Sequence, residues 1–264
     1  MCSGIPLATT DLPDLPSLVS CVRHGYYKSL GHGPISDPEL LSWYKDQRLL
    51  QNGDSLYSDA LNLIGDTPRQ RRDFLSRFLE GAKPGPTHRA IANLAAGGFI
   101  TTIFTTNFDC LIEQAIRENP KCRAPKVAAH EDEARDVLMN DESPKLLKLH
   151  GDYLFSDIKN TARETARLKK NMKDKLRHFL AEAGLVVIGY SGSDGSVMRL
   201  LELMARDGRY FPYGIYWAHI ADRKPSPRVQ SFVAEVEGRL LPVEGADSYL
   251  EQVVNRLEGN PHAS

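Results

Sequence analysis

From residue 99 onward, short apolar runs alternate with segments of helical periodicity, and this alternation constrains the fold more than any other feature of the chain. The runs that we predict to be strands are FITTIFTT (99–106), KLLKLHG (145–151), GLVVIGYS (184–191), YGIYWAHI (213–220) and RLLPVEG (239–245). Runs this apolar are typical of strands buried on both faces. With helices between them, they predict a Rossmann-like α/β fold, in which a mostly parallel sheet is flanked by helices.

The segments between these runs have the periodicity of helices. In segment 108–119 (FDCLIEQAIREN), apolar residues return at positions 111, 112, 115 and 116, so they share one helix face. Further helices are predicted at residues 161–182, 194–206, 226–237 and 246–257. The basic stretch 159–179 is interpreted as a solvated helix face, with a phosphate-contacting surface as the alternative.

Residues 12–96 have a different character, because helical segments and turn residues fill them. Asp37 and Thr67 each precede a proline, and a capping residue followed by proline is a common start of a helix. Helices are predicted at 67–81 and 87–96, and glycine ends each of them. This part of the chain is therefore expected to form a helical module.

The length and charge of the chain narrow its class. Its 264 residues suit a single domain over 1–264, which combines the helical module 12–96 with a Rossmann-like core over 97–264. A net charge of −1 gives no electrostatic argument for binding nucleic acid or an anionic membrane. No apolar run approaches the ~20 residues of a membrane-spanning helix, and no signal peptide is visible. A cytoplasmic protein is expected.

The cysteine pattern predicts no metal site. The four cysteines are Cys2, Cys21, Cys110 and Cys122, and no two of them form a C-x-x-C pair. Structural zinc sites and redox dithiols commonly use such pairs. We expect the four thiols to stay reduced.

Three predicted strands end in polar clusters: TTNFDC (105–110), LHGDY (149–153) and GYSGSD (189–194). In an open parallel sheet, ligands bind beyond the carboxyl ends of the strands, where the loops converge. Polar residues at these ends therefore carry more functional weight than polar residues elsewhere.

In the first cluster, Asn107 and Asp109 lie at a strand-to-helix turn. Either one can cap a helix that starts near residue 108. Two residues with one residue between them do not both fill one cap position, so the other is left for a ligand hydroxyl.

In the second cluster, His150 ends a strand and Gly151 follows it directly. A histidine here is either a packed structural residue or a general base, since an imidazole titrates near pH ~6.5. In the third cluster, small residues let backbone N–H groups approach a phosphate or ribose, and the alternative is an ordinary turn in which Asp194 caps the next helix.

Taken in order, these motifs resemble the SIR2-like (sirtuin-like) family of NAD-consuming proteins. The matching stretches are TTNFDCLIEQA (105–115), KLHGD (148–152) and GLVVIGYSGSD (184–194). The segment PTHRAIANLAAGG (86–98) is similar to the helix that precedes the family's Asn-x-Asp motif. The resemblance covers roughly residues 84–205.

The resemblance implies that NAD is the substrate and that Asn107 and His150 are catalytic. Asn107 matches the asparagine that holds the nicotinamide ribose and a catalytic water, and Asp109 its neighbour at the nicotinamide end. His150 matches the histidine that acts as general base toward a ribose hydroxyl. Gly189, Ser191 and Asp194 match the loop along the adenosine side of NAD. The remaining expected NAD contacts are Thr105, Thr106, Gly151 and Tyr190.

The start of the chain departs from the family pattern. The family opens with a strand and a Gly-Ala-Gly-x-Ser phosphate loop, whereas this sequence begins MCSGIPLA, which resembles the segment just after that loop. Either the start was assigned too late or the protein is truncated at its N-terminus, and without the loop a lower affinity for the pyrophosphate is expected. A lost central strand would leave an unpaired sheet edge.

The absent C-x-x-C pairs are a second departure, because sirtuins that deacylate lysines carry two such pairs in a zinc module. Their absence favours the bacterial SIR2-like branch, whose members hydrolyse NAD in antiphage defence. We therefore expect a zinc-free NAD+ glycohydrolase, switched on by a partner protein or by homo-oligomerisation. The alternatives are a catalytically impaired binding or assembly module and an NAD-dependent protein deacylase.

Overall fold

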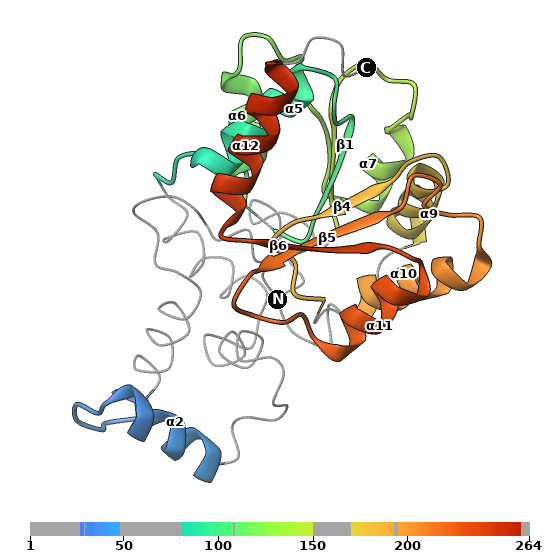
Figure 1. The fold of residues 1–264 in the computed structure, drawn as a ribbon. Helices are drawn as coiled ribbons and strands as arrows, with labels where there is room; N and C mark the ends of the chain where they lie inside the picture. The colour runs from blue at the N-terminus through green and yellow to red at the C-terminus, as the bar shows by residue number, and fades with distance from the viewer. Residues whose placement is uncertain are drawn as a thin grey trace.

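The structure is a computed structural model that describes residues 27–28, 30–47, 81–107, 109–149, 170–192 and 195–259 (Figure 1). Its strands are β1 (Thr102–Thr105), β2 (Lys126–Ala128), β3 (Lys145–Lys148), β4 (Leu185–Val187), β5 (Ile215–Ile220) and β6 (Arg239–Val243). Its helices are α2 (Asp37–Asp46), α5 (Pro86–Ala96), α6 (Leu111–Glu118), α7 (Glu131–Asp136), α9 (Lys170–Leu180), α10 (Gly195–Asp207), α11 (Pro227–Glu235) and α12 (Ala246–Glu258).

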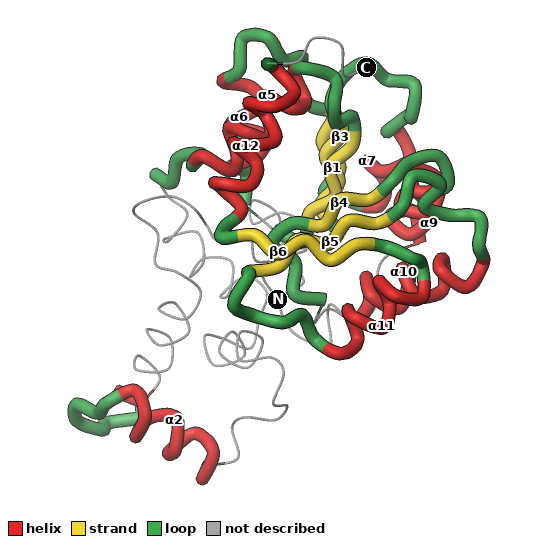
Figure 2. The backbone as a smooth tube through the Cα atoms, viewed as in Figure 1, coloured by secondary structure: helices red, strands yellow, loops and turns green. Residues whose placement is uncertain are grey.

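The strands form two three-stranded parallel sheets within the described residues, with the orders β1-β3-β2 and β4-β5-β6 (Figure 2). In the first sheet, β3 is central, and Lys148 at its end lies opposite Thr105 of β1. In the second sheet, β5 is central, and Trp217 lies between Val187 of β4 and Leu240 of β6. The predicted α/β class with parallel strands and flanking helices is confirmed.

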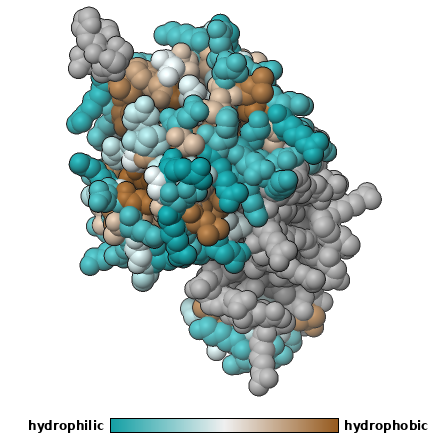
Figure 3. Space-filling view, turned by 90° about the vertical axis from the view of Figure 1, so that its right-hand side faces the viewer, coloured by the Kyte–Doolittle hydropathy of each residue, from teal (hydrophilic) through white to brown (hydrophobic). Residues whose placement is uncertain are grey.

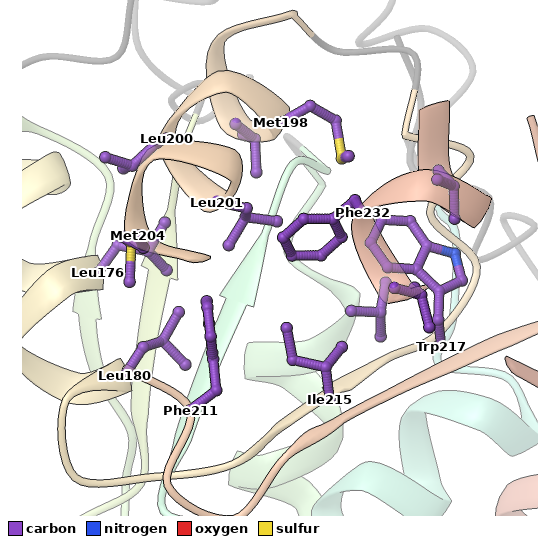
Figure 4. Close-up of a cluster of buried hydrophobic side chains, with 14 of the residues drawn as sticks. Leu176, Leu180, Met198, Leu200, Leu201, Met204, Phe211, Ile215, Trp217 and Phe232 are labelled. Carbon is purple, nitrogen blue, oxygen red and sulfur yellow. The ribbon is translucent and has the colours of Figure 1, made fainter. Parts of the chain in front are cut away.

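Helices cover the strands from two sides (Figure 1). The helices α5, α6 and α12 form one apolar cluster with Leu146 of β3, whereas α9, α10 and α11 form another with Trp217 of β5. Figure 4 shows the second cluster, in which Phe232 of α11 packs between Trp217 and Phe211. Because Leu146 and Leu147 point to opposite faces of β3, both faces of that strand are buried.

The predicted elements of the α/β core correspond closely to the observed ones, with two omissions. The sequence reasoning did not predict β2 or α7, which are three and six residues long. Elements this short carry too few residues for a recognisable period. The predicted helix at 67–81 and residues 161–169 of another lie outside the described residues.

The capping residue of α2 also differs from the prediction. Ser36, rather than Asp37, is the N-cap of this helix, and its backbone N–H donates to Glu39 Oε2 at 3.2 Å. Asp37 is instead the first helical residue, where its negative charge is favourable beside the positive end of the helix dipole.

The face shown in Figure 3 is mainly hydrophilic, and hydrophobic residues reach it in several patches. In the part of the chain that is described, none of the helices has the length and apolar character needed to span a bilayer.

Candidate functional site

The turn after β1 contains a group of polar side chains that are almost fully buried. Thr105, Thr106, Asn107 and Asp109 are each 5–7% exposed. The backbone N–H of Asn107 donates to Thr105 Oγ1 at 3.0 Å, so the end of the strand fixes the position of the next turn. Burying this many polar groups costs free energy unless hydrogen bonds compensate for the lost contacts with water.

Asp109 is the residue of this turn that serves the following helix. Its Oδ1 accepts the backbone N–H of Leu111 at 3.0 Å, and α6 begins at Leu111 rather than near residue 108. The two possibilities left open by the sequence are thereby separated, because Asp109 satisfies a helix N-terminal donor and Asn107 does not fill that position.

A buried ion pair lies directly beneath the same turn. Lys148 Nζ lies 2.5 Å from Glu113 Oε1 of α6, and the two side chains are 0% and 4% exposed. The same ammonium donates to the backbone carbonyl of Asp109 at 2.6 Å and lies 3.6 Å from Cys110 Sγ. The turn is therefore bound to both β3 and α6.

His88, near the start of α5, is a second buried group close to the turn. Its Nδ1 accepts the backbone N–H of Gly85 at 3.1 Å, so the neutral ring carries its proton on Nε2. Nε2 is buried and has no hydrogen-bond partner in the described part of the chain. Burial lowers the pKa of His88, and the negative charges of Asp109 and Asp247 oppose this shift.

A cavity of about 100 Å³ lies between the end of β1 and strand β4 with its following turn. Thr105, Thr106, Leu149 and Tyr190 are among the residues that line it, and the rest of the lining is mainly apolar. Thr106 Oγ1 is buried and lacks a hydrogen-bond partner among the described residues. An unpartnered hydroxyl beside a cavity is a suitable contact for a polar ligand atom.

The turn after β4 is shaped by two glycines with positive φ angles, Gly189 at 66° and Gly192 at 73°. A Cβ at position 192 would lie only 2.3 Å from Val229 Cγ2, so any larger residue there would clash with α11. Between the two glycines, the Tyr190 ring lies 5.7 Å from the Trp217 ring, centroid to centroid. This contact holds Tyr190 against the core of the second sheet.

The structure brings only some of the predicted site residues together. Thr105, Thr106 and Tyr190 line the same cavity. Asn107, Asp109, Gly189 and Ser191 adjoin these residues along the chain. The predicted residues His150, Gly151 and Asp194 lie outside the described residues. The binding and catalytic roles of all these residues stay predictions.

The described residues contain no group of three or more His, Cys, Asp or Glu side chains arranged to hold a metal ion. Neither Cys110 nor Cys122 forms a disulfide within the described residues, and burial raises the pKa of Cys122. Cys2 and Cys21 lie outside the residues that the structure describes.

Sequence reasoning missed Lys148, Glu113 and His88. For Lys148 a signal was present, because a lysine that alternates with leucines in a strand buried on both faces must find a buried partner. For Glu113, the apolar residues around it in the FDCLIEQAIREN segment gave a weaker signal. His88 follows a glycine and a proline at a helix start, where a side chain can bond back to the N-cap.

Comparison with known proteins agrees with this arrangement. The family model described as the SIR2-like domain matches residues 101–237, which is more than half of the chain. The match includes β1, the Asn107–Asp109 turn, the cavity residues and the turn after β4. A search of curated proteins finds no match to the chain.

Proposed function

Because the chain belongs to the SIR2-like family, whose members are generally NAD-dependent enzymes, we propose that it hydrolyses NAD+ at the bond between nicotinamide and ribose. The observation that carries the proposal is the buried turn at Asn107, which follows β1 beside a cavity that is lined in part by Thr105 and Thr106. Both lie within the matched domain. NAD+ is the substrate, and its nicotinamide is the leaving group.

In the proposed reaction, the C–N bond between the ribose and nicotinamide breaks and water supplies the new C–O bond. The sugar gains oxocarbenium-like positive charge as nicotinamide leaves as a neutral molecule. Asn107 orients the attacking water, and neutral His150 accepts a proton from that water or from a ribose hydroxyl. The products are nicotinamide, ADP-ribose and a proton. This proposed reaction requires neither zinc nor another metal.

The remaining side chains are proposed to bind the dinucleotide. Asp109 supports the nicotinamide end through the turn that it stabilises, and its Oδ1 bond to Leu111 N–H supports this role. Gly189, Ser191 and Asp194 are proposed on the adenosine side. The further proposed contacts are Thr105, Thr106, Gly151 and Tyr190.

We extend the proposal to the biological setting that the sequence resemblance suggests. The enzyme would act in the bacterial cytoplasm as an antiphage-defence effector, activated by a partner protein or by homo-oligomerisation. The helical module 12–96 and the core 97–264 would form one domain. Depletion of NAD by such an enzyme would stop the metabolism of an infected cell.

The proposed reaction is tested by incubating the purified chain with NAD+ and measuring free nicotinamide, with and without an acetyl-lysine peptide. Release that does not depend on the peptide supports hydrolysis, because water is then the acceptor. Release only in the presence of the peptide identifies a deacylase and contradicts the proposal. No release in either reaction contradicts hydrolysis by the chain alone, and it leaves a binding or assembly module or an enzyme that needs its activating partner.

A further inference from the structure

Lys148 occupies an unusual position for a lysine, at the buried end of a central strand. Its ammonium has three donors, and the structure gives it three neighbours: Glu113 Oε1, the Asp109 carbonyl and Cys110 Sγ. All three neighbours belong to the turn after β1 or to α6. The side chain therefore links the end of β3 to the segment that carries Asn107.

The alternation of β3 explains why Lys148 faces α6. Lys148 lies on the same side of the strand as Leu146, which packs with α5, α6 and α12. On the backbone, the N–H of Leu149 donates to the carbonyl of Thr105 at 2.8 Å. The end of β1 is thus attached to β3 through the backbone, and the turn that follows it is attached through the Lys148 side chain.

A buried ion pair is weak evidence for a stabilising role. Well-packed apolar residues of similar volume often replace a buried ion pair with neutral or favourable effect, because no charge then has to be desolvated. An apolar pair, however, does not direct a hydrogen bond to the Asp109 carbonyl. What the lysine adds is this directed hydrogen bond, which holds the turn after β1.

We propose that Lys148, held in place by Glu113, is a positioning residue that fixes the Asn107–Asp109 turn against the end of β3. Its consequence for catalysis rests on the function proposed above, whereas its effect on the turn does not. Loss of the pair leaves the fold intact and loosens the turn, and a displacement of about 1 Å at a catalytic group lowers a rate by about 100-fold.

The test uses the double variant Lys148→Met/Glu113→Leu in the full chain, so that no charge is left buried without its partner. Two backbone N–H groups report on the turn, those of Asn107 and Leu111, because side chains of the turn accept their hydrogen bonds. Hydrogen–deuterium exchange is expected to accelerate at least about tenfold at these groups. The N–H of Phe211, which donates to the carbonyl of Leu180, is the reference and keeps its rate.

A matched control removes another ion pair that joins two elements. Arg228 of α11 forms a two-pronged contact with Glu202 of α10, at 2.6 and 2.8 Å. The variant Arg228→Met/Glu202→Leu is expected to leave exchange at Asn107 and Leu111 unchanged. This control separates an effect on the turn from the general effect of removing a salt bridge.

Activity provides the second readout. With NAD+ as substrate, the Lys148/Glu113 double variant is expected to lose at least about tenfold in kcat, with KM within about threefold of wild type. Three results overturn the proposal. They are unchanged exchange at Asn107 and Leu111, a Lys148/Glu113 double variant that fails to fold, and a double variant whose kcat equals that of the Arg228/Glu202 control. Wild-type protein that releases no nicotinamide without an activator removes the kcat readout, and the exchange rates then decide the positioning role alone.

Discussion

Lys148 Nζ lies 2.5 Å from Glu113 Oε1, and water reaches almost none of either side chain. The single substitution Lys148→Met is therefore expected to lower the free energy of unfolding by about 3–5 kcal/mol, because it leaves the Glu113 carboxylate buried without its cation. The double variant Lys148→Met/Glu113→Leu recovers most of this loss. Urea denaturation followed by circular dichroism measures both values.

The exposed pair Arg123–Glu142 is the control for this prediction, since both of its side chains are more than half exposed. Arg123→Met is expected to cost less than about 1 kcal/mol. If Lys148→Met lowers the free energy of unfolding as little as Arg123→Met does, the buried ion pair is contradicted.

His88 makes the stability of the fold sensitive to acid. Burial lowers the pKa of the folded side chain below its ordinary value of 6.5, and the nearby Arg89 acts in the same direction while Asp109 and Asp247 oppose it. Below about pH 6.5 the unfolded chain binds a proton at this site that the folded chain binds less readily. The free energy of unfolding therefore falls as the pH falls, by at most about 1.4 kcal/mol per pH unit from this one group.

The variant His88→Asn is expected to reduce the loss of stability between pH 7.5 and 5.5, measured as the urea midpoint at each pH. Asparagine does not titrate, and its side-chain oxygen can still accept a hydrogen bond. The exposed His178 of α9 is the control, and His178→Asn keeps the wild-type slope. Equal slopes for wild type and His88→Asn would show that His88 is not the group responsible.

Thr106 and Thr105 are adjacent threonines with opposite expected responses to valine. Thr106→Val removes a buried hydroxyl without a partner among the described residues, so the free energy of unfolding rises by about 1 kcal/mol. Thr105→Val removes the hydroxyl that accepts the Asn107 N–H. This variant is expected to lower the free energy of unfolding by about 1–3 kcal/mol. If Thr106 contacts NAD+ in the cavity, Thr106→Val also raises KM about tenfold, and an unchanged KM excludes that contact.

Gly192 is expected to tolerate no side chain, for two separable reasons. Its φ of 73° costs an alanine about 1–2 kcal/mol, and the clash with Val229 adds about 1–3 kcal/mol. Gly208 has a φ of 70° and open space around it, so Gly208→Ala isolates the first cost. Thermal denaturation measures the loss of stability in Gly192→Ala and in Gly208→Ala. Equal losses would mean that the close contact between position 192 and α11 is absent.

Local sequence patterns predicted the class of fold because the strands of the core are apolar and the helices begin and end at recognisable residues. The predictions for β5 and α12, for example, lie within a few residues of the observed bounds. The division of the strands into two three-stranded sheets is a matter of long-range pairing, which no local period encodes. The sequence did not predict β2 and α7, because these elements are too short to show a recognisable period.

For the site, the sequence located the turn at Asn107 and the turn at Gly189 but not the groups that support them. Asp109 and Asn107 were equivalent in the sequence, and only the bond to Leu111 N–H distinguishes them. The position of Lys148 in a buried strand indicated a buried partner but not which one, since its partners lie 35 to 39 positions away in the sequence. Contacts of this kind depend on tertiary packing, so a motif search does not reveal them.

The central claim is that the Asn107 turn and His150 act on NAD+, and nicotinamide release by variant proteins tests it most directly. Asn107→Ala and His150→Ala are each expected to reduce release at least about 100-fold while the thermal unfolding curve keeps its midpoint within a few degrees. Asn93→Ala, at an exposed amide that pairs with Asn119, is the control and keeps the wild-type rate. A folded Asn107→Ala or His150→Ala protein that releases nicotinamide as fast as the wild type contradicts the account.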